Sequence, residues 1–314
     1  MSDFPEAAPT KEAVFVRSRP VRPTNYLSWM VRSLVIIIAL IFALFPVIWI
    51  TSASFNTNGS MSTQRLIPSN AESLNDLLVN YRQLFEDPQI PFWHWMWNSV
   101  VIASISTVLI LMITSFSAYS FSRFRFQGRR NLLLGIFLVQ VFPNILAMVA
   151  LYLMLSQVGD YIPQLGLNTY GGLILVYMGG GMAMNIWLMK GFFDTIPRDI
   201  DESAQVDGAT HWQAYIYLIF PLVRPVMAVV GLLAFVGTFN DFVLARIMLG
   251  LGGTREQWTL MVGMYSFVGS TGEFSTEWGV FAAGSLIAAV PIVILYLVLQ
   301  RFIVGGLTVG AVKG

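Results

Sequence analysis

Long apolar runs separated by shorter polar segments dominate the chain. A helix needs about 20 mainly apolar residues to cross the apolar core of a bilayer, and six runs reach or approach this length. They are residues 34–50, 100–121, 132–155, 171–189, 226–244 and 280–299. The pattern therefore predicts an all-α integral membrane protein with six transmembrane helices, and an even number of crossings leaves both termini on one side.

The distribution of Lys and Arg indicates which side that is. Positively charged flanking segments stay in the cytoplasm, and 14 of the 18 Lys and Arg fall on the side of the two termini. The exceptions are Arg65, Arg82, Arg246 and Arg255. Both termini are therefore predicted to be cytoplasmic.

The spans divide the chain into five parts. They are a cytoplasmic N-terminal tail (1–33), the first transmembrane helix (34–52), an extracytoplasmic loop (53–97), a five-helix core (98–302) and a cytoplasmic C-terminal tail (303–314). The extracytoplasmic loop ends with Trp93, Trp95 and Trp97, and we expect all three at the outer headgroup layer because tryptophan is enriched there. A second outer segment, 246–278, either contacts an external partner or packs along the membrane surface.

Composition agrees with a membrane protein and excludes several functions. Hydrophobic residues make up 56% of the chain and charged residues 11%, and the net charge of +1 offers no basic surface for nucleic acid. Cysteine is absent and the two histidines, His94 and His211, lie far apart, so no metal, cofactor or catalytic site is expected. The phosphate-binding motif Gly-x-x-x-x-Gly-Lys-Ser/Thr is also absent, which predicts that this chain does not hydrolyse ATP.

A few polar side chains lie within the predicted spans or at their ends. They are Gln140, Asn144, Asn185, Asn240 and Asp241. Polar groups at this depth either form hydrogen bonds between helices or line a path for a polar substrate. The sequence leaves both interpretations open.

The cytoplasmic loop at 190–221 has the strongest local signals. Thr195 and Pro197 predict a helix start, acidic residues follow in the first turns, and Gly208 ends the helix. Thr210 and Gln213 have the spacing of a capping box, in which the N-cap side chain and the side chain three residues on bond to each other's backbone. The loop is therefore predicted to form two short helices joined by a glycine turn, with Pro221 and Pro225 leading into the next span.

This loop resembles the EAA loop of type I ABC importer permeases. The family pattern is Glu-Ala-Ala, a spaced glycine, and then Ile and Leu-Pro; here Glu202-Ser203-Ala204, Gly208 and Ile219-Phe220-Pro221 occupy these places, with Ser203 and Phe220 as departures. The C-terminal sequence from Gln300 resembles the tail of the smaller permease subunit of maltose-type sugar importers.

The resemblance implies a bacterial cell-membrane importer with a defined set of partners. These are a second permease subunit, an ATPase dimer that carries ATP and Mg, an extracytoplasmic sugar-binding protein and membrane lipid. The residues implied in coupling to the ATPase are Glu202, Ser203, Ala204, Asp207, Gly208 and Pro221. The tail residues implied in contacting the ATPase are Gly305, Gly306, Leu307, Thr308 and Lys313, although a frayed terminus would have the same sequence.

The substrate implied by the resemblance is maltose, maltodextrin or a related α-glucoside such as trehalose. The alternative from another class is a secondary carrier without an ATPase partner. Such a carrier is expected to have a carboxylate in the middle of a span or an internal repeat. No repeat is evident, and Asp241 lies near the end of its span.

Overall fold

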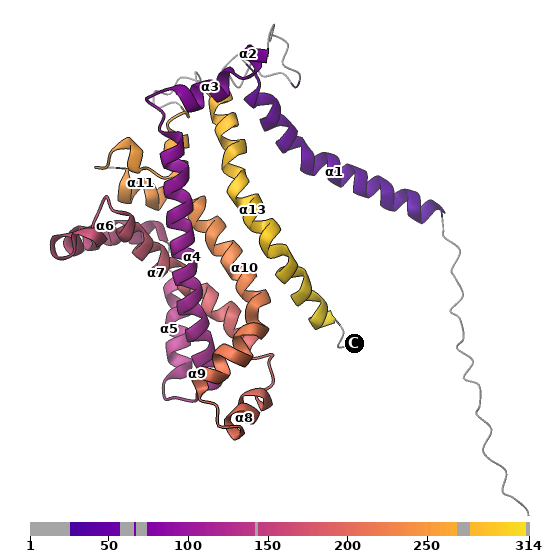
Figure 1. Cartoon of the computed structure of the whole chain (residues 1–314), viewed down its shortest axis with the longest axis vertical. Helices are drawn as coiled ribbons and strands as arrows, with labels where there is room; N and C mark the ends of the chain where they lie inside the picture. Colours follow the sequence, from indigo (N-terminus) through magenta and orange to yellow (C-terminus); the bar gives the residue numbers. More distant parts are fainter. Residues whose placement is uncertain are drawn as a thin grey trace, which may run out of the picture. The chain divides into compact units, whose positions relative to one another are not determined.

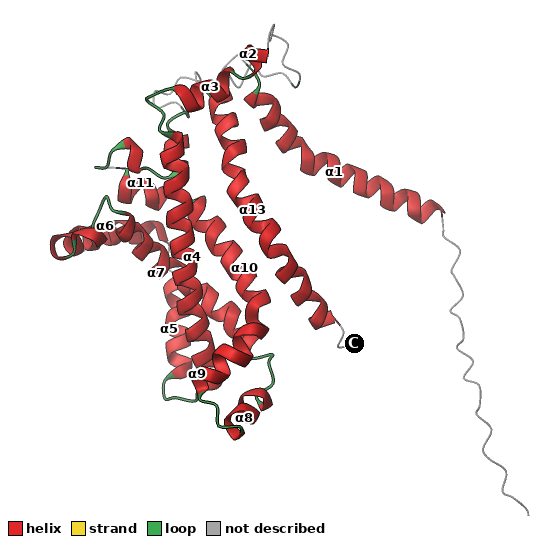
Figure 2. Cartoon of the chain, in the orientation of Figure 1, coloured by secondary structure: helices red, strands yellow, loops and turns green. Residues whose placement is uncertain are grey.

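A computed structural model describes residues 26–56, 66, 74–141, 144–250, 252–268 and 277–311. This part of the chain consists of helices and the loops between them, without strands (Figure 2). The chain divides after Val47 into two units, and each is described by itself.

The first unit holds most of α1 (Tyr26–Ser54), which is apolar on all sides and contains Pro46. Its large hydrophobic side chains are exposed, with Leu34 at 58% and Phe42 at 82%. A helix of this kind satisfies its own backbone hydrogen bonds and is stable when lipid surrounds its side chains.

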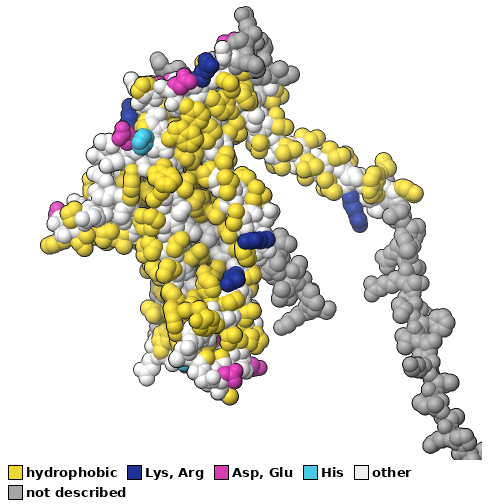
Figure 3. Space-filling view, viewed as in Figure 1, with side chains coloured by type: hydrophobic (Ala, Val, Ile, Leu, Met, Phe, Trp, Pro, Cys, Tyr) yellow, Lys and Arg dark blue, Asp and Glu magenta, His cyan; other side chains and the backbone are white. Residues whose placement is uncertain are grey.

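The second unit contains the remaining helices (Figure 1). Their bounds are α2 (Leu74–Leu77), α3 (Val79–Glu86), α4 (Phe92–Arg123), α5 (Arg129–Val141), α6 (Asn144–Tyr161), α7 (Tyr170–Phe193), α8 (Asp199–Val206), α9 (His211–Ala214), α10 (Phe220–Phe239), α11 (Val243–Leu249), α12 (Leu260–Tyr265) and α13 (Trp278–Ala311). A π-helical segment, Tyr215–Ile219, joins α9 to α10, and short 3-10 helices occur at Pro163–Leu165 and Arg255–Gln257. Hydrophobic side chains cover most of the visible middle of this unit (Figure 3).

Five helical stretches of the described residues are long and apolar enough to cross a membrane. They are Ser28–Ser54, Phe92–Arg123, Tyr170–Phe193, His211–Phe239 and Trp278–Ile303. The predicted third span, 132–155, is instead two shorter helices, α5 and α6, which run in different directions (Figure 1). The interruption falls at Pro143, outside the described residues, and proline removes a backbone donor that a continuous helix requires.

The core of the second unit forms around α4, which packs mainly against α7 and α10. At one end Trp95 and Phe92 pack with Phe239, and at the other Phe193 packs with Tyr215, all of them buried. Because α4 contacts both neighbours along its length, it links the two ends of the unit. In Figure 1 α8 and α9 lie at one end and α2 and α3 at the other.

Trp95 is buried, unlike the two tryptophans on either side of it. Trp93 and Trp97 are 60% and 69% exposed, as interfacial residues would be, but Trp95 is 1% exposed. These residues lie in the first turns of α4. Side chains two residues apart in a helix point to opposite faces. The indole Nε1–H of Trp95 donates to the Arg255 carbonyl at 2.7 Å. A β-carbon at Gly263 would lie 2.1 Å from the Trp95 Cδ2 atom, so only glycine fits there.

The outer segment after α10 packs closely on α4. Asn98 Nδ2 donates to the Glu256 and Trp258 carbonyls, and the Leu260 N–H donates to Ser99 Oγ at 2.7 Å. Up to residue 268 the described segment therefore favours the packing interpretation over an extended contact loop. Residues 269–276 lie outside the described part of the chain.

Candidate functional site

The loop at 190–221 folds as two short helices with a glycine turn between them, as predicted. Gly208 has a φ of +84°, a conformation that other residues rarely adopt. Its N–H donates to the Gln205 carbonyl at 3.0 Å and the Ala209 N–H donates to the Ala204 carbonyl at 2.9 Å. This pair of bonds is a Schellman motif, which satisfies the last carbonyls of α8. The turn therefore has a fixed geometry.

The two helix starts differ in how they are capped: α9 has a capping box, whereas α8 has no side-chain cap. Thr210 and Gln213 form the predicted capping box: the Thr210 Oγ1 accepts from the Gln213 N–H at 3.2 Å, and the Gln213 Oε1 accepts from the Thr210 N–H at 2.8 Å. The start of α8 lies later than predicted, at Asp199. Thr195 does not cap it, because its hydroxyl donates to the Phe192 carbonyl at the end of α7.

A π-helical turn connects the loop to α10. The Phe220 N–H donates to the Tyr215 carbonyl, five residues back. Pro221 follows and has no N–H to donate, so the usual bond to the residue four positions earlier cannot form there. Backbone hydrogen bonds thus continue from α9 into α10, and π-helical turns of this kind are frequent at functional sites.

The loop residues implied in coupling divide between a buried and an exposed face. Glu202, Ser203, Asp207, Gly208 and Pro221 are exposed, whereas Ala204 is 6% exposed and faces inward. Val206 is 87% exposed beside them. The outer face of α8 thus combines two carboxylates with an apolar side chain, a surface suited to contact with another protein.

A buried ion pair attaches α8 to the end of α4. Arg123 Nε lies 2.8 Å from Asp201 Oδ2, with both side chains under 10% exposed. The Tyr119 hydroxyl also contacts Asp201, at 3.4 Å. Sequence reasoning missed this role of Asp201 and assigned it only to the first turn of the helix. Nothing in the local pattern identifies its partner, which is 78 residues away.

Further bonds attach the segment before α8 to the same end of α4. Arg123 Nη2 donates to the Ile196 carbonyl at 3.1 Å, and Arg198 Nη2 donates to the Ser122 carbonyl at 3.1 Å. Ser122 Oγ donates to Asp194 Oδ1 at 2.7 Å. Loop and helix are therefore joined by charged side chains and backbone carbonyls.

Asp194 is kept ionised by these surroundings. Partial burial acts to raise the pKa of Asp194, but hydrogen bonds from Lys190 and Ser122 and the nearby charges of Lys190 and Arg129 outweigh it and lower that pKa below its ordinary value. The loop therefore has a stable negative charge at its base.

A cavity of about 480 Å³ lies among α4, α5, α7, α10 and α11. Most of its lining is apolar, and we call it the polar cavity after the polar side chains that it contains. Three of the five polar residues singled out from the sequence line it, Gln140, Asn185 and Asp241. Asn240 is separate and lines a different hollow with Met264 and Ser285. The side chain of Asn144 lies outside the described residues.

Hydrogen bonds orient the side chains of this cavity. The Tyr177 hydroxyl donates to Asp241 Oδ2 at 2.9 Å, and the Ala245 N–H donates to the same oxygen at 3.0 Å. The Asn185 amide donates to the Gly181 carbonyl at 2.7 Å and the Gln140 amide to the Gly180 carbonyl at 3.2 Å.

Tyr177 was not among the residues predicted from the sequence. Its spacing of eight residues from Asn185, which puts both on one face of α7, could have identified it.

The cavity keeps acceptors for a polar ligand. Within the described residues, Asp241 Oδ1 and the amide oxygens of Gln140 and Asn185 have no hydrogen-bond partner. One carboxylate and two neutral amides suit a neutral ligand with many hydroxyl groups, because hydroxyls donate to such oxygens.

The C-terminal segment continues as helix. α13 extends to Ala311 and so includes Gly305, Gly306, Leu307 and Thr308, where a separate tail was expected. The side chains from residue 304 onward, and all of Lys313, lie outside what the structure describes.

Comparison with known proteins gives a consistent result. Residues 110–308, more than half of the chain, match the family described as "Binding-protein-dependent transport system inner membrane component". The chain is 40% identical over 277 residues to the maltose/maltodextrin transport system permease protein MalG of Vibrio vulnificus, covering 86% of this chain and 91% of that protein. Identity to MalG of Escherichia coli K12 is 37% over the same coverage.

A solved structure has the same fold. It is the crystal structure of a bacterial ABC transporter involved in the import of the acidic polysaccharide alginate, with a TM-score of 0.69. At 23% identity the match covers 90% of this chain and 99% of that one.

Proposed function

This chain belongs to the family of binding-protein-dependent transport system inner membrane components, and from that premise we propose that it forms half of the membrane pathway of an ATP-driven importer of maltose, maltodextrin or a related α-glucoside such as trehalose. The family makes it a multi-pass inner-membrane permease subunit of an ABC importer. It is a transport component without a catalytic domain.

The substrate class rests on two independent observations. Relatives at 40% and 37% identity have names that specify maltose and maltodextrin. The cavity that contains Gln140, Asn185 and Asp241 presents hydrogen-bond acceptors with a single carboxylate and no cation among its lining residues. An uncharged sugar meets these groups without the need for a counter-ion, whereas an acidic sugar would be repelled by Asp241.

The partners follow from this role. A second permease subunit supplies the other half of the pathway, an ATPase dimer binds ATP and Mg, and an extracytoplasmic sugar-binding protein delivers the substrate. The exposed face of α8, made of Glu202, Ser203, Val206 and Asp207, is the docking surface for the ATPase. The observation that carries this proposal is the buried Arg123–Asp201 pair, which joins that exposed face to a core helix of the membrane unit.

The C-terminal segment contributes a second contact to the ATPase. The small residues Gly305 and Gly306, with Leu307 and Thr308, allow close approach of another backbone at the end of α13. A complex that lacks residues 307–314 is expected to bind the ATPase less tightly or to hydrolyse ATP without transport. Normal assembly, hydrolysis and transport by the truncated complex would remove this role.

Reconstitution tests the proposal as a whole. The chain is co-expressed with its neighbouring permease and ATPase subunits, purified as a complex and placed in proteoliposomes with the sugar-binding protein. We expect ATP-dependent uptake of labelled maltose that a non-hydrolysable ATP analogue abolishes. Uptake by the chain alone under an ion gradient would instead favour the secondary carrier.

A further inference from the structure

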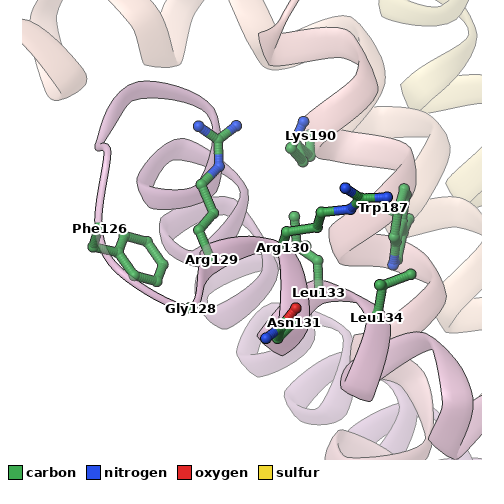
Figure 4. Close-up of a pocket in the computed structure, with 9 residues that line it drawn as sticks. All are labelled: Phe126, Gly128, Arg129, Arg130, Asn131, Leu133, Leu134, Trp187 and Lys190. Atoms are coloured by element: carbon green, nitrogen blue, oxygen red, sulfur yellow. The ribbon is translucent and has the colours of Figure 1, made fainter.

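A second cavity of this chain lies at the cytoplasmic end, apart from the polar cavity and beside the first residue of the loop at 190–221. Its volume is about 620 Å³, and it is bounded by the loop after α4, the first turns of α5 and the last turns of α7 (Figure 4). We name it the basic pocket; the side chains used below are Phe126, Arg129, Arg130, Leu134, Trp187 and Lys190.

The basic pocket has an excess of positive charge. Three of its nine lining residues are cations and none is acidic. Lys190 is paired with Asp194, which lies outside the pocket. Among the residues that the structure describes, neither Arg129 nor Arg130 has an ion-pair partner. Neither guanidinium is held in an ion pair, although the charge of Arg129 also acts on nearby Asp194. Guanidinium binds phosphate oxygens in a bidentate geometry.

Apolar side chains form the other side of the basic pocket. Leu134 is 45% exposed and Trp187 37%, and Phe137 meets the Trp187 ring edge-on at 5.8 Å. Further along the same helices Leu138 and Met184 are 66% and 60% exposed, so the apolar surface continues away from the cations. Cations beside a tryptophan, followed by an apolar band, match the order of headgroup, interface and acyl chain in a bilayer.

The frame of the pocket is fixed. Leu133 is buried against Phe121 and Ile186, which holds the start of α5 on α4 and α7. Gly128 has a φ of +82°, and its carbonyl accepts from the Leu132 N–H at 2.8 Å. The backbone of the two arginines that follow Gly128 is therefore held in place, and Figure 4 shows the Arg130 side chain extended toward Trp187.

We propose that the basic pocket binds the phosphate of an anionic phospholipid of the inner leaflet, with Arg129 and Arg130 on the phosphate and Trp187 and Leu134 against the glycerol and acyl chains. Basic pockets between membrane helices on the cytoplasmic side are suited to such headgroups. Free phosphate would use the cations but would leave the aromatic and leucine surface uncovered. This site is independent of the transported sugar.

Native mass spectrometry of the full permease complex tests the proposal. Complexes are incubated with phosphatidylglycerol, and the lipid that stays bound is measured for the wild type and for the double variant Arg129→Gln/Arg130→Gln. The matched control Arg125→Gln/Arg224→Gln removes two exposed cytoplasmic arginines that do not line the pocket. We expect the pocket variant to retain about tenfold less lipid, with the control near the wild type. An equal loss in both would show general surface attraction and overturn the site.

Two further measurements distinguish lipid binding from the binding of free phosphate and from misfolding. Trp187→Leu is expected to weaken phosphatidylglycerol retention, and excess inorganic phosphate is expected not to displace the lipid. Displacement by inorganic phosphate, with no effect of Trp187→Leu, would identify a phosphate site and contradict the lipid proposal. The thermal unfolding temperature of the double Gln variant is expected to stay near that of the wild type, and a loss of lipid that occurs only together with a loss of folding would overturn the site.

Discussion

The Asp201 carboxylate and the Arg123 guanidinium, 78 residues apart in the chain, meet at 2.8 Å beneath the exposed face of α8. Both side chains are buried, so each ion has lost its hydration water and is stabilised by the opposite charge instead. Its geometry attaches the coupling loop to a helix that contacts α7 and α10. The proposed role of the loop depends on this attachment.

Removing one member of this pair should destabilise the loop strongly. Asp201→Asn leaves Arg123 buried without a counter-ion, and such a loss costs about 3–5 kcal/mol. The measurement is the thermal unfolding of the purified complex, with protease sensitivity of the loop as a local probe. Arg123→Met/Asp201→Leu removes both charges and is expected to recover most of the stability.

The exposed pair on the same loop is the control for this prediction. Lys190 and Asp194 also form an ion pair, but Asp194 is 43% exposed. Exposed pairs contribute about 0–1 kcal/mol, so Lys190→Gln should have a small effect. Equal losses from Asp201→Asn and Lys190→Gln would mean that the buried pair has no special role.

A variant on the outer face of α8 tests the coupling proposal. Glu202→Lys reverses a charge on the proposed docking surface without touching the buried pair. Sugar-stimulated ATPase activity and transport should fall by about tenfold or more, because an interfacial charge reversal places like charges together. The same change at Asp160, an exposed carboxylate at the end of α6, should leave both activities near the wild type. Wild-type coupling in Glu202→Lys would exclude this face of α8.

The glycine turn gives an independent test of the same proposal. Gly208→Ala forces a side chain into a φ of +84°, with a cost of about 1 kcal/mol, although nothing lies within 4 Å of the new β-carbon. The effect should therefore appear as a modest loss of coupling with normal insertion. Gly208→Pro should abolish coupling, since it removes the N–H that bonds to Gln205.

Local and long-range features of the coupling loop differ in how well the sequence predicts them. The capping box of Thr210 and Gln213 and the terminator Gly208 depend on residues within one helical turn, so spacing alone identifies them. The partner of Asp201 depends on tertiary packing of α4, and no local pattern contains that information. The burial of Trp95 was not predicted for the same reason, because composition at the start of a span does not specify which face of the helix is buried.

The polar cavity was partly predictable. Amides and carboxylates are rare in apolar runs, which identified Gln140, Asn185 and Asp241, whereas Tyr177 has an aromatic ring that is common in such runs. The interruption between α5 and α6 could be inferred only as a kink at Pro143. One long apolar helix and two shorter apolar helices give the same run of apolar residues in the sequence.

The cavity proposal predicts that changes at Tyr177 and Asp241 alter the kinetics of sugar uptake. Tyr177→Phe removes the hydroxyl that orients Asp241, and Asp241→Ala removes the acceptor itself. A hydrogen bond to a charged group contributes about 1.5–3 kcal/mol, so the KM for sugar uptake should rise by about tenfold or more in Asp241→Ala. The control is Asn240→Ala, next in the chain but in another hollow. If both variants leave uptake kinetics unchanged, these polar groups serve helix packing.

Packing at the outer end provides the last prediction, Gly263→Ala. The added methyl group would lie 2.1 Å from Trp95, and the indole cannot move without losing its bond to the Arg255 carbonyl. Overpacking of this kind costs about 1–3 kcal/mol. Gly135→Ala is the control, because a β-carbon there has no atom within 4 Å. Thermal unfolding should separate the two variants by several degrees. If the outer segment were a loop that adjusts freely to a partner, Trp95 and α12 would move apart without cost and the two variants would unfold together.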